Sequence, residues 1–245
     1  MNSDIDILLP LGPETGDHYW ETRFALRSIE KNANGWRRVI VLGKDPGFLS
    51  KTSDKILFVP LHEFPCNKEA RISNKVVWAF KNISDISDYV AFWNDDYALL
   101  KPTDVRSIPF FRKREDLIKC ANGSAGRYQT AIKTTGRMLT KEGHPMWQYD
   151  LHLPIVYHGD RFLELKWWWA QSQMTTHGLL VKSIYSNVWL PEPGPVHTDC
   201  KMQSIEELAR AQDRFCFSYN DMAFNNGLKD WLKKQFPDPS SMEVS

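Results

Sequence analysis

Two adjacent carboxylates, Asp95 and Asp96, follow Asn94 at the end of an apolar run. Residues 88–93 (DYVAFW) are typical of a buried strand, so the pair is predicted to lie where a strand ends. Adjacent carboxylates are unfavourable unless a positive group compensates them. Mg²⁺ or Mn²⁺ commonly takes one or two protein carboxylates together with substrate phosphate oxygens. We therefore predict a metal and diphosphate site here, with Asp95 and Asp96 as metal ligands and Asp96 also as a catalytic residue. The alternative is a turn in which an aspartate caps the next segment.

A second cluster, residues 71–75 (RISNK), opens a predicted helix. Cations and free backbone N–H groups at a helix N-terminus form an anion site. Arg71, Asn74 and Lys75 are therefore candidate donor-binding residues. Arg23, on an earlier predicted helix, is a similar candidate. A capped or solvated surface helix explains these residues equally well.

A third cluster contains Asp150 and His152 in the segment DLHLP. A histidine beside a carboxylate can act as a general base on an acceptor hydroxyl, because its pKa lies near neutrality. His152 and Asp150 are therefore candidate catalytic residues, although a lone histidine is more often structural. Asp221, in the segment SYND, is a further acidic candidate that could equally be a helix N-cap.

The first hundred residues alternate between strand-like and helix-like segments. Apolar runs predict strands over 4–9, 38–42, 55–59 and 88–93, and helical periodicity predicts helices over 18–31 and 71–81. This alternation indicates an α/β layer with a largely parallel sheet. After Pro102 the pattern is irregular, until helices are predicted over 204–213 and 220–234. We predict one continuous catalytic domain, with a donor-binding half over 1–105 and an acceptor-binding half over 106–245.

The chain has the composition of a soluble globular protein, with 42% hydrophobic and 25% charged residues. Its N-terminus lacks the basic start of a signal peptide. No window approaches the roughly 18 consecutive apolar residues of a membrane span. The four cysteines lack metal-ligand spacing, which favours free thiols in a reducing compartment. These features predict a cytoplasmic protein without a membrane span.

The formal net charge of +1 hides a basic stretch over 101–141, which has ten Lys or Arg residues against three acidic ones. A solvated face explains such a stretch, and so does a surface that meets a polyanion or a phosphate-bearing acceptor. Three consecutive tryptophans, Trp167, Trp168 and Trp169, could stack on flat ligands, but a core helix or strand explains them more simply.

The order of these clusters resembles the Stealth family of sugar-phosphate transferases, which includes bacterial capsular polysaccharide polymerases and the animal N-acetylglucosamine-1-phosphotransferase. The likeness is strongest over 21–31 (ETRFALRSIEK), which is similar to a Glu-Leu-Arg-Tyr-Ser-Leu-Arg-Ser-Ile-Glu-Lys helix of the family. Further segments that resemble family motifs are 4–6 (DID), 72–74 (ISN), 92–96 (FWNDD), 152–154 (HLP), 219–221 (YND) and 236–243 (FPDPSSME). The resemblance therefore runs from end to end of the chain.

The resemblance implies a GT-A-like fold, in which helices flank a Rossmann-type mixed sheet, with an irregular C-terminal acceptor half. It also implies a nucleotide diphospho-sugar donor, expected to be UDP-linked, and dependence on Mn²⁺ or Mg²⁺. Asp95 and Asp96 would hold metal and diphosphate, and His152 would activate the acceptor hydroxyl. The donor pocket would include Arg23, Asn74 and Asp221.

The chain departs from the family pattern at two places. Residues 8–12 (LLPLG) replace the Trp-Val-Asp-Gly-x-Asp that usually follows the opening strand, and no arginine occurs between Lys166 and Tyr185, where the phosphotransferases carry one. Both places touch the sugar phosphate in the family. Transfer of a sugar and transfer of sugar-1-phosphate therefore both stay open, and the missing arginine favours ordinary glycosyl transfer.

Two other functions fit the sequence. The basic stretch and the tryptophans would suit a phage-type DNA glycosyltransferase that acts on a flipped, hydroxylated base. A non-catalytic module that binds a nucleotide or a carbohydrate would keep the fold without turnover. The full set Asp95, Asp96, His152 and Asp221 argues against such a module, because a binding module needs no general base.

Overall fold

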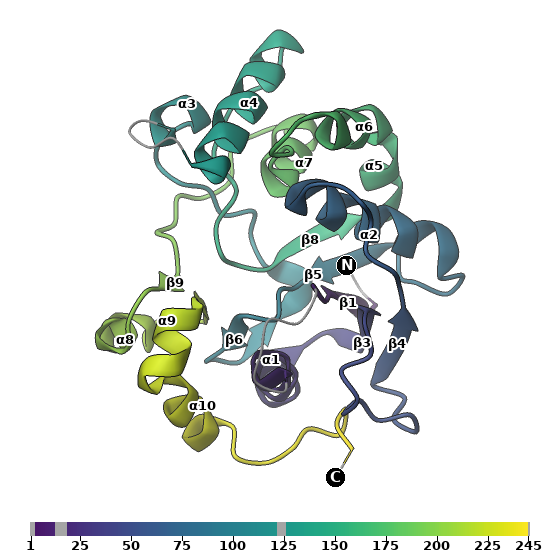
Figure 1. Cartoon of the computed structure of the whole chain (residues 1–245), viewed down its shortest axis with the longest axis vertical. Helices are drawn as coiled ribbons and strands as arrows, with labels where there is room; N and C mark the ends of the chain where they lie inside the picture. Colours follow the sequence, from purple (N-terminus) through teal and green to yellow (C-terminus); the bar gives the residue numbers. More distant parts are fainter. Residues whose placement is uncertain (1–2, 13–18, 122–125, 245) are drawn as a thin grey trace.

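The computed structural model of the chain describes residues 3–12, 19–121 and 126–244. Its central sheet has the strand order β4-β3-β1-β5-β8 (Figure 1). The strands of this sheet are β1 (Ile5–Pro10), β3 (Trp36–Gly43), β4 (Ile56–Pro60), β5 (Tyr89–Phe92) and β8 (Ile155–His158). β1, β3, β4 and β5 run parallel, and β8 is antiparallel to β5. The predicted α/β fold with a mixed, largely parallel sheet is thereby confirmed.

A hydrophobic core lies on each face of the central sheet, because successive side chains of a strand point to opposite faces. In β1, Ile7 and Leu9 belong to one core and Leu8 to the other. β3 divides in the same way, with Val41 in the first core and Leu42 in the second. All five side chains are fully buried. Strands buried on both faces explain the continuous apolar runs in the sequence.

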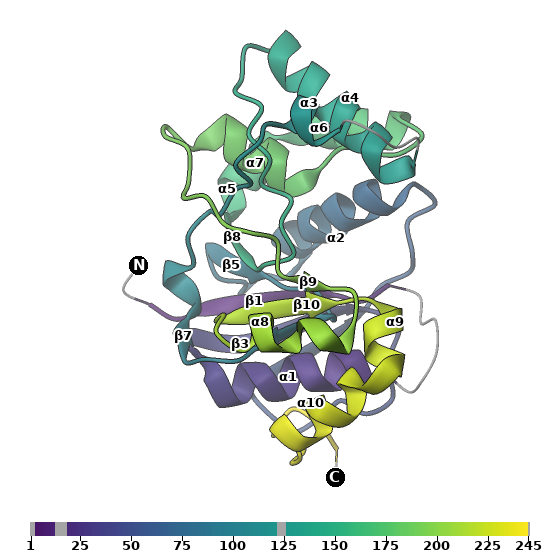
Figure 2. The ribbon, with the colours of Figure 1, turned by 90° about the vertical axis from the view of Figure 1, so that its left-hand side faces the viewer.

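Helices cover both faces of this sheet (Figure 2). The first core is shared by α1 (Trp20–Asn32), α8 (Leu208–Ala211), α9 (Asp221–Ala223) and α10 (Lys229–Gln235). The second core is covered by α2 (Lys68–Asn82), α5 (Gly159–Glu164), α6 (Lys166–Met174) and α7 (Val181–Trp189). Two further helices, α3 (Leu117–Cys120) and α4 (Arg127–Lys141), extend this second layer away from the sheet. The predicted first helix is observed from residue 20, and residue 18 lies outside the described part of the chain.

A second sheet, with the order β6-β10-β9, joins distant parts of the sequence. It contains β6 (Tyr97–Leu99), β9 (Lys201–Met202) and β10 (Cys216–Tyr219). β10 is antiparallel to β6 and parallel to β9. Because β6 begins directly after Asp96, this sheet places residues near 200 and 218 beside the predicted metal site. The remaining short elements are β2 (Ala33–Asn34), β7 (Thr103–Asp104), η2 (Val105–Ser107), η3 (Ile205–Glu207) and η4 (Phe224–Leu228).

The segment that the sequence pattern described as irregular contains helices α4 to α7. Gly136 explains why α4 was missed, since glycine in the middle of a helix disfavours it in isolation. A Cβ on Gly136 would lie 3.0 Å from Ile118 Cδ1 and 3.2 Å from Leu117 Cβ, so glycine allows α4 to pack closely on α3. The helix predicted over 220–234 is interrupted at Gly227, which has a left-handed φ of 104°.

Across the three described stretches, none of the helices has the length and apolar character needed to cross a membrane.

Candidate active site

Asn94, Asp95 and Asp96 form the turn between β5 and β6. The backbone N–H of Tyr97 donates to the carbonyl of Asn94 across this turn (3.2 Å). The turn lies at the carboxyl end of β5, which pairs with β1 in the central sheet. In open α/β sheets, ligands bind outside the carboxyl ends of the strands. The three residues therefore lie at the edge of the sheet where this fold class binds its ligands.

Acidic side chains from three parts of the chain gather at this turn. Burial, followed by the charges of Asp95, Asp96 and Asp221, raises the pKa of Glu21 to about 8. Burial, followed by the charge of Asp96, raises the pKa of Asp95 to about 6. Lys201 Nζ lies 3.9 Å from Asp96 Oδ2 and is the cation that partly offsets these charges. Such a cluster favours a bound cation.

The hydrogen bonding of the turn leaves a place for a divalent cation. Asp96 Oδ2 accepts a hydrogen bond from Ser218 Oγ at 2.9 Å, whereas Asp96 Oδ1 is buried and finds no partner in the described part of the chain. Among the described residues, no group of three Asp, Glu, His or Cys side chains is placed to enclose a metal. The protein therefore offers two adjacent carboxylates and would leave further positions to phosphate oxygens and water, which is the usual arrangement for Mg²⁺.

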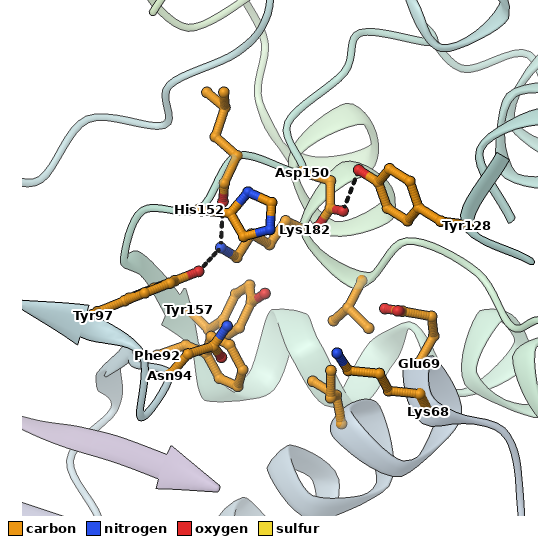
Figure 3. Close-up of a pocket in the computed structure, with 13 residues that line it drawn as sticks. Lys68, Glu69, Phe92, Asn94, Tyr97, Tyr128, Asp150, His152, Tyr157 and Lys182 are labelled. Carbon is orange, nitrogen blue, oxygen red and sulfur yellow. Dashed lines mark hydrogen bonds between the residues drawn. The ribbon is translucent and has the colours of Figure 1, made fainter. Parts of the chain in front are cut away.

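A pocket of about 140 Å³ adjoins Asn94 (Figure 3). Polar and charged groups line it from separate elements, namely Lys68 and Glu69 on α2, Asn94 after β5, Asp150 and His152 before β8, and Lys182 on α7. The structure thus brings two of the predicted catalytic residues, Asp150 and His152, into one pocket with Asn94.

His152 is paired with Asp199 rather than with its sequence neighbour Asp150. His152 Nδ1 lies 3.0 Å from both carboxylate oxygens of Asp199, and the backbone N–H of His152 donates to Oδ1 (3.1 Å). Burial acts to raise the pKa of Asp199, but the hydrogen bonds and charge of His152, with Lys113, hold it well below its usual value. Asp199 is therefore a carboxylate, and it favours the tautomer in which Nδ1 carries the proton. His152 Nε2 is then the proton-accepting atom.

Asp150 makes a different contact in the pocket. Its Oδ2 accepts a hydrogen bond from the hydroxyl of Tyr128 on α4 (2.8 Å). Its charge also acts on Glu69, whose pKa is raised by burial and then by Asp150. Asp150 is therefore placed to contact a ligand in the pocket, not to orient His152.

Lys182 connects the two sides of the site. Its buried ammonium donates to the carbonyls of Leu151 and Leu153 (2.7 Å each) and to the hydroxyl of Tyr97 (2.9 Å). The two carbonyls flank His152, and Tyr97 directly follows the acidic turn. Burial lowers the pKa of Lys182, and nearby carboxylates act against this lowering. One side chain thus fixes the segment of His152 relative to the turn formed by Asn94, Asp95 and Asp96.

A second hollow, of about 460 Å³, lies at the carboxyl ends of β1, β3 and β4. Gly43, which has a φ of 147°, helps to form it: a Cβ there would lie 2.9 Å from the carbonyl oxygen of Leu11. Lys44, His62 and Glu63 also line this hollow. Glycine at position 43 therefore permits the close approach of two chain segments at the ligand-binding edge.

Two of the predicted donor-binding cations contact Glu63, which lines this second hollow. The ammonium of Lys75 is buried and donates to the carbonyl of Leu11 and to Glu63 Oε1. Arg71 Nη1 lies 3.6 Å from Glu63 Oε2. Glu63 thus pairs with both cations. An anionic group of a ligand could take the place of the Glu63 carboxylate beside them.

Asn74 and Arg23 have other contacts. Asn74 accepts a hydrogen bond from Gln173 Nε2 (3.0 Å), which connects α2 to α6. Arg23 Nη1 donates to Glu243 near the C-terminus (2.7 Å), and the guanidinium carbon lies 3.9 Å from the ring centroid of Phe48. Arg23 lines a third hollow with Lys44 and Phe48. Neither Asn74 nor Arg23 lines the pocket that contains His152.

The features that suggested DNA lie mostly away from this pocket. Within the described part of the basic stretch 101–141, Tyr128 is the single residue that lines the pocket. The cations of α4 are displayed on its surface, with Arg127, Arg137 and Lys141 exposed. Trp168 and Trp169 are 6% and 3% exposed. The core interpretation is therefore confirmed for these two tryptophans, whereas Trp167 is 45% exposed.

Several residues of the site were not predicted from the sequence. Asp199 lies 47 positions from His152, and nothing in its local sequence (VHTDC) distinguishes it from a surface acid. Lys182 and Tyr157 lie within apolar stretches that indicate core packing. Glu21 lies in the segment 21–31 that resembles the Stealth family, but the resemblance gave no role for it. A charged residue in an apolar run, as at Lys182, is the one signal that the sequence contained.

Comparisons with known proteins support the fold. No protein-family model matches the sequence, and no curated protein matches it. Two solved structures of the galactosyltransferase LgtC each cover 97% of this chain and 98% of their own, at 10% sequence identity. LgtC in complex with donor and acceptor sugar analogues superposes with a TM-score of 0.51, and an active-site mutant of LgtC with 0.53. The chain therefore has a GT-A glycosyltransferase fold.

Proposed function

We propose that the protein is a metal-dependent transferase that moves a sugar from a nucleotide diphospho-sugar to a hydroxyl group of an acceptor. The observation that carries this proposal is the pair His152 and Asp199, which lies in a pocket beside Asn94 and the acidic turn. A carboxylate that orients a histidine serves proton transfer and is not needed for binding alone. The pair therefore favours an enzyme over a non-catalytic module.

The general base in this proposal is His152. Asp199 keeps the Nδ1 atom protonated, so Nε2 accepts the proton of the acceptor hydroxyl. The acceptor oxygen then forms a bond to the anomeric carbon of the donor, and the bond from that carbon to the diphosphate breaks. The resulting imidazolium is stabilised by the charge of Asp199, which lies 3.0 Å away.

The donor is proposed to lie along the carboxyl edge of the sheet. Its nucleoside would occupy the hollow between Lys44 and Glu63, near Lys75. Its diphosphate would lie at Asp95 and Asp96, where a bound Mn²⁺ or Mg²⁺ would neutralise the charge of the leaving group. Its sugar would then point to the pocket of His152. The adjacent positions of these sites support this order.

The experiment that tests this function is a donor screen with Mn²⁺ present. The protein is incubated with a panel of UDP-, GDP- and CMP-linked sugars, and the released nucleotide is identified by mass. We expect a nucleoside diphosphate, which indicates sugar transfer or its hydrolytic side reaction. A nucleoside monophosphate from a diphospho-sugar would instead indicate transfer of sugar-1-phosphate.

Matched variants identify the residues that are needed for release of the nucleotide. His152→Ala and Asp96→Asn are expected to lower the rate by at least about 100-fold, the range for loss of a general base or of metal-dependent leaving-group stabilisation. His158→Ala serves as the control. His158 lies at the end of β8, just after the segment that contains His152, but it does not line the pocket. Full activity in both of the first two variants would refute the proposed function.

A further inference from the structure

Among the residues that the structure describes, the hydroxyl of Tyr157 has no hydrogen-bond partner, although Tyr157 is fully buried. Tyr157 lies in β8 and lines the pocket beside His152, and Figure 3 shows its hydroxyl facing the space between Asn94 and His152. A buried polar group without a partner is rare in folded proteins, because it loses its hydrogen bonds to water and gains none. The hydroxyl therefore lacks a hydrogen-bond partner that a bound ligand could provide.

The ring of Tyr157 is packed among three other aromatic rings, which fixes the position of its hydroxyl. Its centroid lies 4.8 Å from that of Tyr185, 4.9 Å from that of Phe162 and 5.8 Å from that of Phe92. Tyr185, the neighbouring tyrosine, does have a protein partner, since its hydroxyl accepts the backbone N–H of His158 (2.8 Å). The contrast between the two tyrosines shows that the local packing can satisfy a hydroxyl, yet leaves that of Tyr157 open to the pocket.

Tyr97 presents a second hydroxyl to the same pocket. Its oxygen accepts a hydrogen bond from the Lys182 ammonium (2.9 Å). Because the ammonium can only donate, the hydrogen of the Tyr97 hydroxyl must be given to another group. Within the described residues, no acceptor for this hydrogen is present, and Tyr97 is itself 1% exposed. Lys182 thus leaves Tyr97 as a hydrogen-bond donor toward the pocket.

Both hydroxyls keep their protons. The ordinary pKa of tyrosine lies near 10, and burial, followed by the charge of Asp150, raises the pKa of Tyr157 further. Each group is therefore an O–H donor at neutral pH. The side chain of Asn94 lies on the same side of the pocket and adds an amide that can donate or accept.

We infer that Tyr97 and Tyr157 are substrate-binding residues whose hydroxyls donate hydrogen bonds to oxygen atoms of a sugar in this pocket. The inference rests on the proposed function and adds to it the groups that recognise the sugar. The sugar of the donor and a sugar of the acceptor offer the same hydroxyl and ring oxygens. The free protein retains two donors with no protein acceptor because the substrate completes these hydrogen bonds.

The test uses Tyr157→Phe, which removes the hydroxyl and keeps the ring. Removing a buried group without a partner should stabilise the free protein, and we expect Tm to rise by about 2–4 °C. Sugar binding should weaken by about three- to tenfold, which is the contribution of one hydrogen bond. Tyr185→Phe is the matched control: it loses the hydrogen bond from His158, so Tm should fall while sugar binding stays unchanged.

Binding is measured calorimetrically with two kinds of probe. UDP-glucose and UDP-galactose with Mn²⁺ report on a donor sugar, and methyl glucopyranoside and methyl galactopyranoside report on an acceptor sugar. Weaker binding of either kind by Tyr157→Phe supports the inference and identifies which sugar occupies the pocket. Equal binding by wild type and Tyr157→Phe would overturn it, and so would a lower Tm of the variant. If the wild type binds no probe, the proposed function fails first and the inference falls with it.

Discussion

Nδ1 of His152 lies 3.0 Å from both carboxylate oxygens of Asp199, a residue 47 positions further along the chain. Asp199 lies two positions before Lys201, the first residue of β9, and Lys201 Nζ lies 3.9 Å from Asp96 Oδ2. One short segment therefore contacts both His152, the proposed general base, and the acidic turn. This arrangement explains how the second sheet contributes to the site although it lies outside the central sheet.

Asp199→Asn is expected to abolish most turnover. An amide can neither stabilise the imidazolium nor favour the Nδ1-protonated tautomer as a carboxylate does, so the rate of nucleotide release should fall by at least about 100-fold. The donor KM should change little, because Asp199 does not line the donor hollow. Asp230→Asn, a substitution at an exposed site, is the control and should retain full activity. A variant at Asp199 with more than half of the wild-type rate would contradict the role given to the pair.

Two buried lysines allow a second prediction, because each anchors a different part of the site. Lys182 holds the segment of His152, whereas Lys75 holds Glu63 at the proposed nucleoside hollow. Lys182→Met should lower kcat by about tenfold or more with a small change in donor KM, since the base is displaced and the donor hollow is intact. Lys75→Met should raise donor KM and affect kcat less.

Steady-state kinetics of both lysine variants with the same donor measure this difference. Circular dichroism and thermal unfolding at the assay temperature confirm that the compared proteins are folded. If both variants change kcat and KM in the same proportion, Lys182 is a general structural residue and not one that positions His152.

The raised pKa of Glu21 predicts how stability depends on pH. The folded protein retains a proton on Glu21 up to about pH 8, whereas the unfolded chain loses it near 4.5. The free energy of unfolding should therefore decrease as the pH rises from about 4.5 to about 8. Above pH 8 the decrease is complete. Glu21→Gln carries no charge and should show a smaller decrease between pH 5 and pH 9. Urea unfolding at both pH values measures this, and parallel pH dependence in the two proteins would contradict the prediction.

The sequence predicted the acidic turn well because its signal is local. An apolar run followed by Asn94, Asp95 and Asp96 predicts a strand and a polar turn at its end, and the structure places β5 and the turn there. The strands near 5–10 and 36–43 were predicted for the same reason, since residues buried on both faces of a sheet must be apolar.

The remainder of the site depends on contacts that local sequence does not contain. Lys182 reaches Tyr97 from 85 positions away, and Asp199 reaches His152 from 47. The neighbour Asp150, which the sequence suggested beside His152, is bonded to Tyr128 on another helix. The backbone of the short segment before β8 sets the directions of the Asp150 and His152 side chains. Their closeness in sequence does not determine which residues they contact. The pairing of His152 with Asp199 could therefore be found only from the fold.

The C-terminal segment provides the last prediction, because it joins α1 through one buried carboxylate. The Glu243 side chain is fully buried and accepts from Arg27 Nε (2.7 Å) and Arg23 Nη1 (2.7 Å). Glu243→Ala would leave the Arg27 charge buried without its partner, which costs about 3 kcal/mol and lowers Tm by about 6–12 °C. Differential scanning calorimetry measures this shift. Glu30→Ala is the matched control, since Glu30 binds Ser241 of the same segment at an exposed position and should change Tm far less. Equal shifts in the two variants would show that the segment is held by its apolar contacts and not by the buried ion pair.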